Sequence, residues 1–149
     1  MQKSYLALGC FWKPEETFRQ IAGVVETEVG YAGGNNSNTN YEEVCTGKTG
    51  HTETVKITYD EKIIPYEKLL EIFFKIHDPT QKDMQYPDMG TQYRSEIFYE
   101  NEQQKNIAEE YKKLFNEKFD GKIETNISKI KNYCKAEAYH QKYIMKRNQ

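Results

Sequence analysis

Residues 5–22 are predicted to form a strand, a tight turn and a helix, and this unit constrains the fold more than any other stretch. Residues 5–8 are an apolar run that ends at Gly9. Apolar positions then recur at helical spacing, at Phe18, Ile21 and Ala22. Pro14 is favoured in a first helical turn because its missing N–H would have no partner there. The helix should therefore begin within two or three residues of Cys10, which places this thiol near a helix N-terminus.

Cys10 has two interpretations at this point. A helix N-terminus stabilises an anion, so we expect the pKa of the thiol to be lowered, with the charges of Glu15 and Glu16 opposing the effect. Phe11 and Trp12 would then be walls of a small apolar pocket beside the sulfur. The alternative is a small buried hydrophobic residue, which is what most free cysteines are.

Hydrophobic periodicity elsewhere predicts a mixture of strands and helices. Strands are expected at 25–29, 53–59, 93–99 and 123–127. Helices are expected at 41–45, 65–76, 101–120 and 136–146. Residues 30–40 and 78–92 are rich in turn-forming residues and are expected to be loops. Because the elements intermix without a strict repeat, we expect the α+β class, as a single-domain two-layer α/β sandwich over residues 1–149 with a mixed β-sheet flanked by helices.

The strand at 53–59 carries a carboxyl group on its apolar face. Its alternation of period two puts Glu53 on one side with Val55, Ile57 and Tyr59. Burial would raise the pKa of Glu53 and keep it protonated near neutral pH, so that it could donate a proton. The alternative is that Glu53 lies at a frayed strand end and reaches solvent.

Charge and composition argue against several classes of function. The chain has 21 basic and 23 acidic side chains and a net charge of -2, so no strong field for nucleic acid or for an anionic membrane is expected. No stretch approaches a membrane span, and the first eight residues are too polar for a signal peptide. A reducing, cytoplasmic location is therefore expected.

Three cysteines are present, Cys10, Cys45 and Cys134. They form no CxxC pair and have no zinc-like spacing, so neither a disulfide framework nor a metal site is expected. A thiolate at Cys10 would instead act as a nucleophile, with a neutral carboxylic acid at Glu53 and phenol groups to protonate or stabilise a displaced oxygen. A methyl sulfoxide fits a pocket that combines such donors with aromatic walls, and an acyl or peroxide substrate also fits this reasoning.

Six motifs occur in order along the chain, and together they resemble the A-type peptide methionine sulfoxide reductases. They are Gly9-Cys10-Phe11-Trp12 with Glu15, residues 30–34, 41–45, 49–53, 90–95 and 136–141. The resemblance implies an α/β enzyme without metal or organic cofactor. It also implies reduction of the S-epimer of methionine sulfoxide, free or in proteins, as a repair of oxidised proteins.

The resemblance also assigns roles by motif position. It implies that Cys10 is the nucleophile and passes through a sulfenic acid, and that Glu53 is the acid. Tyr41 and Tyr93 would donate hydrogen bonds to the sulfoxide oxygen. Further positions implied to bind substrate are Phe11 and Trp12 as the methyl-binding wall, and Asp88 as the acidic residue that orders water and the substrate backbone.

Two departures from the family pattern affect these expectations. Lys13 and Pro14 replace the small residues usual after Trp12 and would alter the rim of the pocket. No cysteine follows the Tyr-His-Gln motif, where many relatives carry resolving cysteines. Cys134 is then the possible internal resolver, whereas Cys45 is expected to be a buried or half-buried thiol. The preferred expectation is direct reduction of the sulfenic acid by an external thiol, from thioredoxin or from glutaredoxin with glutathione.

Two other functions remain open from the sequence. A cysteine hydrolase would pair Cys10 with His51 or His140, both of which are expected to be structural instead. A non-catalytic thiol switch would form a sulfenic acid with peroxide without turning over a sulfoxide. Neither alternative requires Glu53, Tyr41 or Tyr93.

Overall fold

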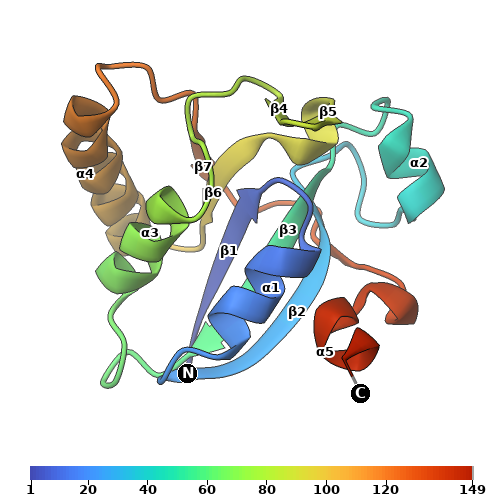
Figure 1. Ribbon diagram of the computed structural model, residues 1–149, viewed down its shortest axis with the longest axis horizontal. Coiled ribbons are helices and arrows are strands. Elements are labelled where there is room, and N and C mark those ends of the chain that lie inside the picture. Colours follow the sequence, from blue (N-terminus) through green and yellow to red (C-terminus); the bar gives the residue numbers. More distant parts are fainter. Residues whose placement is uncertain (149) are drawn as a thin grey trace.

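The computed structural model describes residues 1–148 and contains one large mixed sheet, a small hairpin and helices packed against the sheet (Figure 1). The strands are β1 (Gln2–Leu8), β2 (Val24–Ala32), β3 (Thr52–Tyr59), β4 (Met84–Gln85), β5 (Asp88–Met89), β6 (Ser95–Tyr99), β7 (Asn126–Lys129) and β8 (Cys134–Lys135). The α-helices are α1 (Trp12–Arg19), α2 (Tyr41–Cys45), α3 (Tyr66–Lys75), α4 (Glu102–Lys118) and α5 (Tyr143–Arg147). Two 3-10 turns, η1 (Thr91–Tyr93) and η2 (Ala138–His140), complete the chain.

The large sheet has the strand order β7-β6-β1-β3-β2-β8, and β4 pairs separately with β5. Neighbouring strands of the large sheet are antiparallel except for β6 and β7, which are parallel. Helices α1, α3 and α4 lie on one face, as Figure 1 shows. The α+β class and the mixed sheet with flanking helices are confirmed.

The main core fills the space between the sheet and these helices. Leu6 and Leu8 of β1 face it together with Val55 and Ile57 of β3, because residues two apart share a face. A smaller cluster covers the opposite face. Its buried members are Tyr5, Ala7, Ala32 and Phe98, and Ile130 and Tyr133 pack over them.

The outer edge of β2 is closed partly by a side chain. The two-residue strand β8 pairs only with Gly30 and Tyr31. At Val29 the side chain of Gln141 takes the place of a neighbouring strand, since its Oε1 accepts from the Val29 N–H at 2.9 Å and its Nε2 donates to the Val29 carbonyl at 2.8 Å.

Four expected element boundaries were wrong. Strand β2 continues through 30–32, which were expected to be a loop, and Gly30 is needed there because a Cβ would lie 2.6 Å from the Cys134 carbonyl oxygen. Tyr93 belongs to η1 and not to the strand that follows it. The last strand is β8, and the terminal helix is split into η2 and α5 by Lys142, whose φ is 50°.

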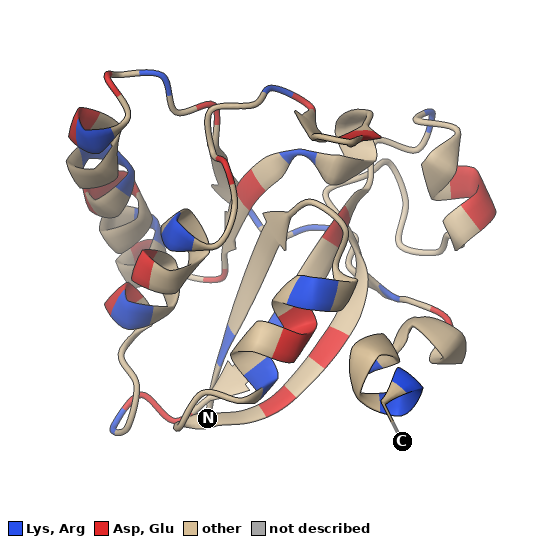
Figure 2. Ribbon diagram, viewed as in Figure 1, with Lys and Arg blue, Asp and Glu red and all other residues tan. Residues whose placement is uncertain are grey.

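The surface charges are mixed in sign. In Figure 2 basic and acidic residues alternate along α1, α3 and α4. None of the helices within residues 1–148 is both long and apolar enough to cross a bilayer.

Candidate active site

Cys10 lies half-buried directly after β1, where the chain turns into α1. The turn passes through Gly9, whose φ is 94°. A Cβ on Gly9 would lie 2.9 Å from the Gln85 side chain, so glycine allows both the turn and the close approach of β4. The expected strand, turn and helix around Cys10 are confirmed.

Glu53 is the buried carboxyl group beside this thiol. Only 2% of the residue is exposed, and its Oε1 accepts a hydrogen bond from the Phe11 N–H at 3.1 Å. Burial raises the pKa of Glu53 to about 8, and the charge of Asp88 acts in the same direction, against the Phe11 hydrogen bond. Glu53 is therefore largely protonated at neutral pH, as the alternation of the strand predicted.

The expected lowering of the Cys10 pKa was wrong for the substrate-free protein. Burial raises the pKa of the thiol to about 12. The Trp12 N–H opposes this shift, whereas the negative charges of Glu53 and Asp88 add to it. The thiol and the acid thus both hold their protons before substrate arrives.

Two phenol groups complete the polar side of the site. A hydrogen bond to the Cys45 thiol, together with burial, raises the pKa of Tyr41 to about 12. Burial raises the pKa of Tyr93, and the charge of Glu53 and the neighbouring Tyr41 raise it further. Both phenols are therefore protonated hydrogen-bond donors near neutral pH.

An aromatic cluster fixes the position of Trp12. Its indole N–H donates to Nδ1 of His140 at 3.0 Å, and its ring stacks on Tyr143 with centroids 3.8 Å apart. The His140 ring lies 5.1 Å from Phe11 and 5.0 Å from Tyr41, centroid to centroid. Phe11 is only 1% exposed, so it packs into the core, whereas Trp12 is half-buried.

A cavity of about 460 Å³ opens beside the thiol. Cys10 and Asp88 both line it, and Asp88 comes from β5 of the small hairpin. Lys13 and Pro14 also line this cavity, so the two residues that depart from the family pattern do lie next to the thiol. Within residues 1–148 the structure has no group of three or more His, Cys, Asp or Glu side chains that could hold a metal ion.

Comparison with known proteins identifies the family. The model of the family described as peptide methionine sulfoxide reductase matches residues 2–149. The chain belongs to the peptide methionine sulfoxide reductase family. The resemblance carried by the six motifs is thereby confirmed, and the protein is an oxidoreductase that reduces methionine sulfoxide.

Individual reductases match over nearly the whole chain. The peptide methionine sulfoxide reductase MsrA of Pelagibacter ubique is 54% identical over 147 residues, which cover 99% of this chain and 100% of the relative. The crystal structure of Mxr1 from Saccharomyces cerevisiae in reduced form has a TM-score of 0.94 and 38% identity, covering 99% of this chain and 86% of that chain. A structure of Mxr1 in complex with Trx2 has a TM-score of 0.68 and 28% identity, covering 95% of this chain and 84% of that chain.

The other thiols of this reductase are placed differently from Cys10. Cys45 is exposed at the end of α2, so the expectation of a buried or half-buried thiol was wrong. Cys134 is half-buried on β8, and its thiol donates to the Thr39 carbonyl oxygen at 3.4 Å. All three cysteines are free.

Sequence reasoning missed one residue that organises the reductase site. Glu137 accepts hydrogen bonds from the Tyr31 hydroxyl at 2.8 Å and from the Tyr41 N–H at 2.9 Å. It thereby ties the start of α2 to β2. The signal was its place within the motif at 136–141, next to the aromatic and histidine positions.

Proposed function

We propose that this chain reduces the S-epimer of methionine sulfoxide, free or in proteins, through a sulfenic acid on Cys10. The supporting observation is the buried carboxyl of Glu53, which lies beside the thiol and has a pKa near 8. Attack on a sulfoxide sulfur requires a proton for the sulfoxide oxygen, and a carboxylic acid with this pKa is a suitable donor at neutral pH. Glu53 is thus the acid in this proposal.

The proposed reductase step transfers one oxygen atom. The Cys10 sulfur forms a bond to the substrate sulfur, Glu53 protonates the sulfoxide oxygen, and the thiol proton goes to Glu53. The bond between the oxygen and the substrate sulfur then breaks and the oxygen bonds to the Cys10 sulfur, while the bond between the two sulfurs breaks and leaves its electron pair on the thioether sulfur of methionine. One thiol and one sulfoxide thus become one sulfenic acid and one methionine.

Other residues bind the substrate in this proposal. The hydroxyls of Tyr41 and Tyr93 donate to the sulfoxide oxygen as negative charge develops on it. Trp12, held by His140, contacts the substrate methyl group, and Phe11 supports it from the core. Asp88 lines the same cavity as Cys10 and is suited to order water and the substrate backbone.

The sulfenic acid is then reduced by an external thiol. The first thiol condenses with it, releasing water and leaving a mixed disulfide that a second thiol reduces. Cys134 is an unsuitable resolver in this conformation, because β8 lies three strand spacings from β1, about 14 Å, and a disulfide needs Cα atoms within about 7 Å.

The structure of Mxr1 with Trx2 supports a thioredoxin as the external reductant of this chain. Glutaredoxin with glutathione is the other candidate reductant. Because turnover needs a reduced Cys10 and all three thiols are free, we place the protein in the reducing cytoplasm, acting as a single reductase domain over residues 1–149.

A cysteine hydrolase is disfavoured by the hydrogen bonds of both candidate bases. His140 uses Nδ1 to accept from Trp12, and His51 places Nε2 2.9 Å from the Asn36 carbonyl oxygen. Both histidines are buried, and burial lowers the pKa of each. Each holds another segment in place, and among the described residues neither histidine hydrogen-bonds Cys10.

A single-turnover reaction tests the proposal. The reduced protein is mixed with the S-epimer of a blocked methionine sulfoxide, and the methionine formed and the thiols remaining are counted. We expect one methionine per chain and the loss of one thiol, with no reaction in Cys10→Ser. Loss of a second thiol at Cys134 would overturn the recycling scheme, and absence of methionine would overturn the reductase mechanism.

A further inference from the structure

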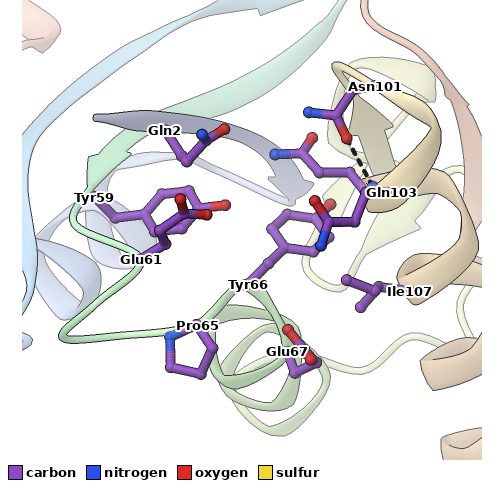
Figure 3. Close-up of a pocket in the computed structure, with 10 residues that line it drawn as sticks. Gln2, Tyr59, Glu61, Pro65, Tyr66, Glu67, Asn101, Gln103 and Ile107 are labelled. Atoms are coloured by element: carbon purple, nitrogen blue, oxygen red, sulfur yellow. Dashed lines mark hydrogen bonds between the residues drawn. The ribbon is translucent and has the colours of Figure 1, made fainter.

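A second cavity lies at the end of the sheet opposite to Cys10. It has a volume of about 200 Å³ and lies between the end of β3 and the starts of α3 and α4 (Figure 3). Its lining residues are Gln2, Tyr59, Glu61, Pro65, Tyr66, Glu67, Asn101, Gln103, Gln104 and Ile107. Glu53 is the second residue of β3 and Tyr59 the last, and they are about 20 Å apart at a rise of about 3.3 Å per residue. A ligand in this cavity therefore does not contact the reacting sulfur.

Tyr66 lines this cavity, and its hydroxyl group is buried and unsatisfied. The residue is 5% exposed, and its hydroxyl has no hydrogen-bond partner among the described residues. In Figure 3 its phenol points toward the side chains at the start of α4. Buried hydroxyl groups without a partner are rare because they have lost hydration without compensation. The hydroxyl therefore retains hydrogen-bonding capacity for a ligand that reaches it.

The side chain of Gln104, which also lines the cavity, already has hydrogen-bond partners for both of its polar atoms. Nε2 of Gln104 donates to the Lys3 carbonyl oxygen at 2.8 Å, and its Oε1 accepts from the Glu100 N–H at 2.8 Å. Among the described residues that line this cavity, Tyr66 therefore has the only buried side-chain polar atom without a hydrogen-bond partner.

The charge and the aromatic surface of the cavity indicate what it binds. Glu61 and Glu67 contribute two carboxylates, and none of the described lining residues is basic. The rings of Tyr59 and Tyr66 lie with centroids 6.5 Å apart. Aromatic faces and carboxylates both attract cations, whereas an anion would be repelled. A purely apolar ligand would leave the Tyr66 hydroxyl without a partner.

We propose that this cavity binds a primary ammonium group carried on a short alkyl chain. The ammonium donates one hydrogen bond to the Tyr66 hydroxyl and pairs with Glu67 and Glu61. The alkyl chain lies against the tyrosine rings. The volume is below the range of about 300–1,000 Å³ typical of sites for drug-sized ligands, which fits a small amine.

Two sources can supply such a group, a free diamine or a lysine side chain of a protein. The probe for the first is 1,4-diaminobutane and the probe for the second is Nα-acetyl-lysine amide, with 1,4-butanediol as the neutral comparison. Each is titrated by NMR at low ionic strength into the full chain. Binding of either amine supports the proposal, and their relative affinities identify the source. Absence of binding by both amines at 10 mM overturns the proposal.

Variants separate specific binding from general attraction to acidic groups. Tyr66→Phe keeps the ring and removes the hydroxyl, and Glu67→Gln removes one charge. We expect each to weaken amine binding about tenfold, the factor associated with a hydrogen bond or ion pair to a charged group. Glu71→Gln is the matched control, because Glu71 lies on the same helix and pairs with Lys75 at 2.8 Å outside the cavity.

Two results would overturn the proposal. One is that Glu71→Gln weakens amine binding as much as Glu67→Gln does, and the other is that the neutral diol binds as tightly as the amines. Reductase activity should be unchanged in Tyr66→Phe, because the cavity is remote from Cys10. Thermal unfolding gives a second readout, since the amine should raise the Tm of the wild-type protein and raise that of Tyr66→Phe less.

Discussion

The backbone N–H of Phe11 donates a hydrogen bond to Oε1 of Glu53 at 3.1 Å, so the residue after the thiol is tied to the buried acid. This contact joins the turn that carries Cys10 to the start of β3. It leaves the other carboxyl oxygen of Glu53 free to carry a proton. The geometry of the thiol and the protonation of the acid are thus coupled through one amide.

Replacement of Glu53 by Gln should slow methionine formation in a single turnover by about 100- to 10,000-fold, the usual contribution of a general acid. The wild-type rate should fall as pH rises above about 8, when Glu53 loses its proton. The neighbouring groups that influence the pKa of Glu53 are Cys10, Asp88 and the Phe11 N–H. A pH–rate profile of both proteins checks this, and an unchanged alkaline limb in Glu53→Gln would contradict it.

The same substitution should stabilise the fold at alkaline pH. The pKa of Glu53 is raised from an ordinary value of 4.5 to about 8, so the folded state binds more protons between these values. Wild-type stability therefore falls as pH rises through this window, at about 1.4 kcal/mol per unit of pKa shift. Glu53→Gln lacks this loss. The free energy of unfolding of Glu53→Gln relative to that of the wild-type protein should therefore increase by a few kcal/mol between pH 5 and pH 9, as measured by urea unfolding.

Tyr143→Ala should weaken substrate binding more than it slows the chemical step. The stacked ring under Trp12 is lost, so the indole gains freedom although its bond to His140 remains. We expect the KM for a sulfoxide peptide to rise several-fold, as removal of one aromatic contact of about 1 kcal/mol implies. Tyr111→Ala is the control, since the ring of Tyr111 packs on Phe115 within α4 with centroids 6.5 Å apart, and an equal KM change there would contradict the role of the stack.

Two asparagine caps provide a matched pair of variants. The side chain of Asn40 accepts from the Glu43 N–H at the start of α2, and that of Asn101 accepts from the Gln104 N–H at the start of α4, both at 2.9 Å. Replacing either by Ala should cost about 1 kcal/mol of stability in urea unfolding. Only Asn40→Ala should also lower kcat, because α2 begins with Tyr41.

Local patterns predicted the parts of the site that depend on neighbouring residues. The period of two placed Glu53 on the buried face of β3, and Pro14 located the start of α1 close to Cys10. Both features follow from backbone geometry over a few residues. They were correct because tertiary packing reinforces the local preference.

Features that depend on distant segments were not predictable from such patterns. The raised pKa of Cys10 comes from burial and from the charges of Glu53 and Asp88, which the fold brings together from β3 and β5. The extension of β2 through Gly30 depends on the close approach of β8. The position of Trp12 depends on His140, 128 residues away. Periodicity does not reveal such contacts.

The carboxamide of Gln141 that lies against Val29 has a consequence for the solution behaviour of the protein. An exposed strand edge offers free N–H and carbonyl groups to the strands of other molecules, which promotes aggregation. Gln141 occupies both groups of Val29, and it follows directly on η2, which carries His140. The short segment formed by η2 and Gln141 therefore holds the aromatic cluster of the candidate site and also covers the edge of β2. Its detachment would expose the aromatic cluster and leave the backbone groups of Val29 free to pair with strands of other molecules.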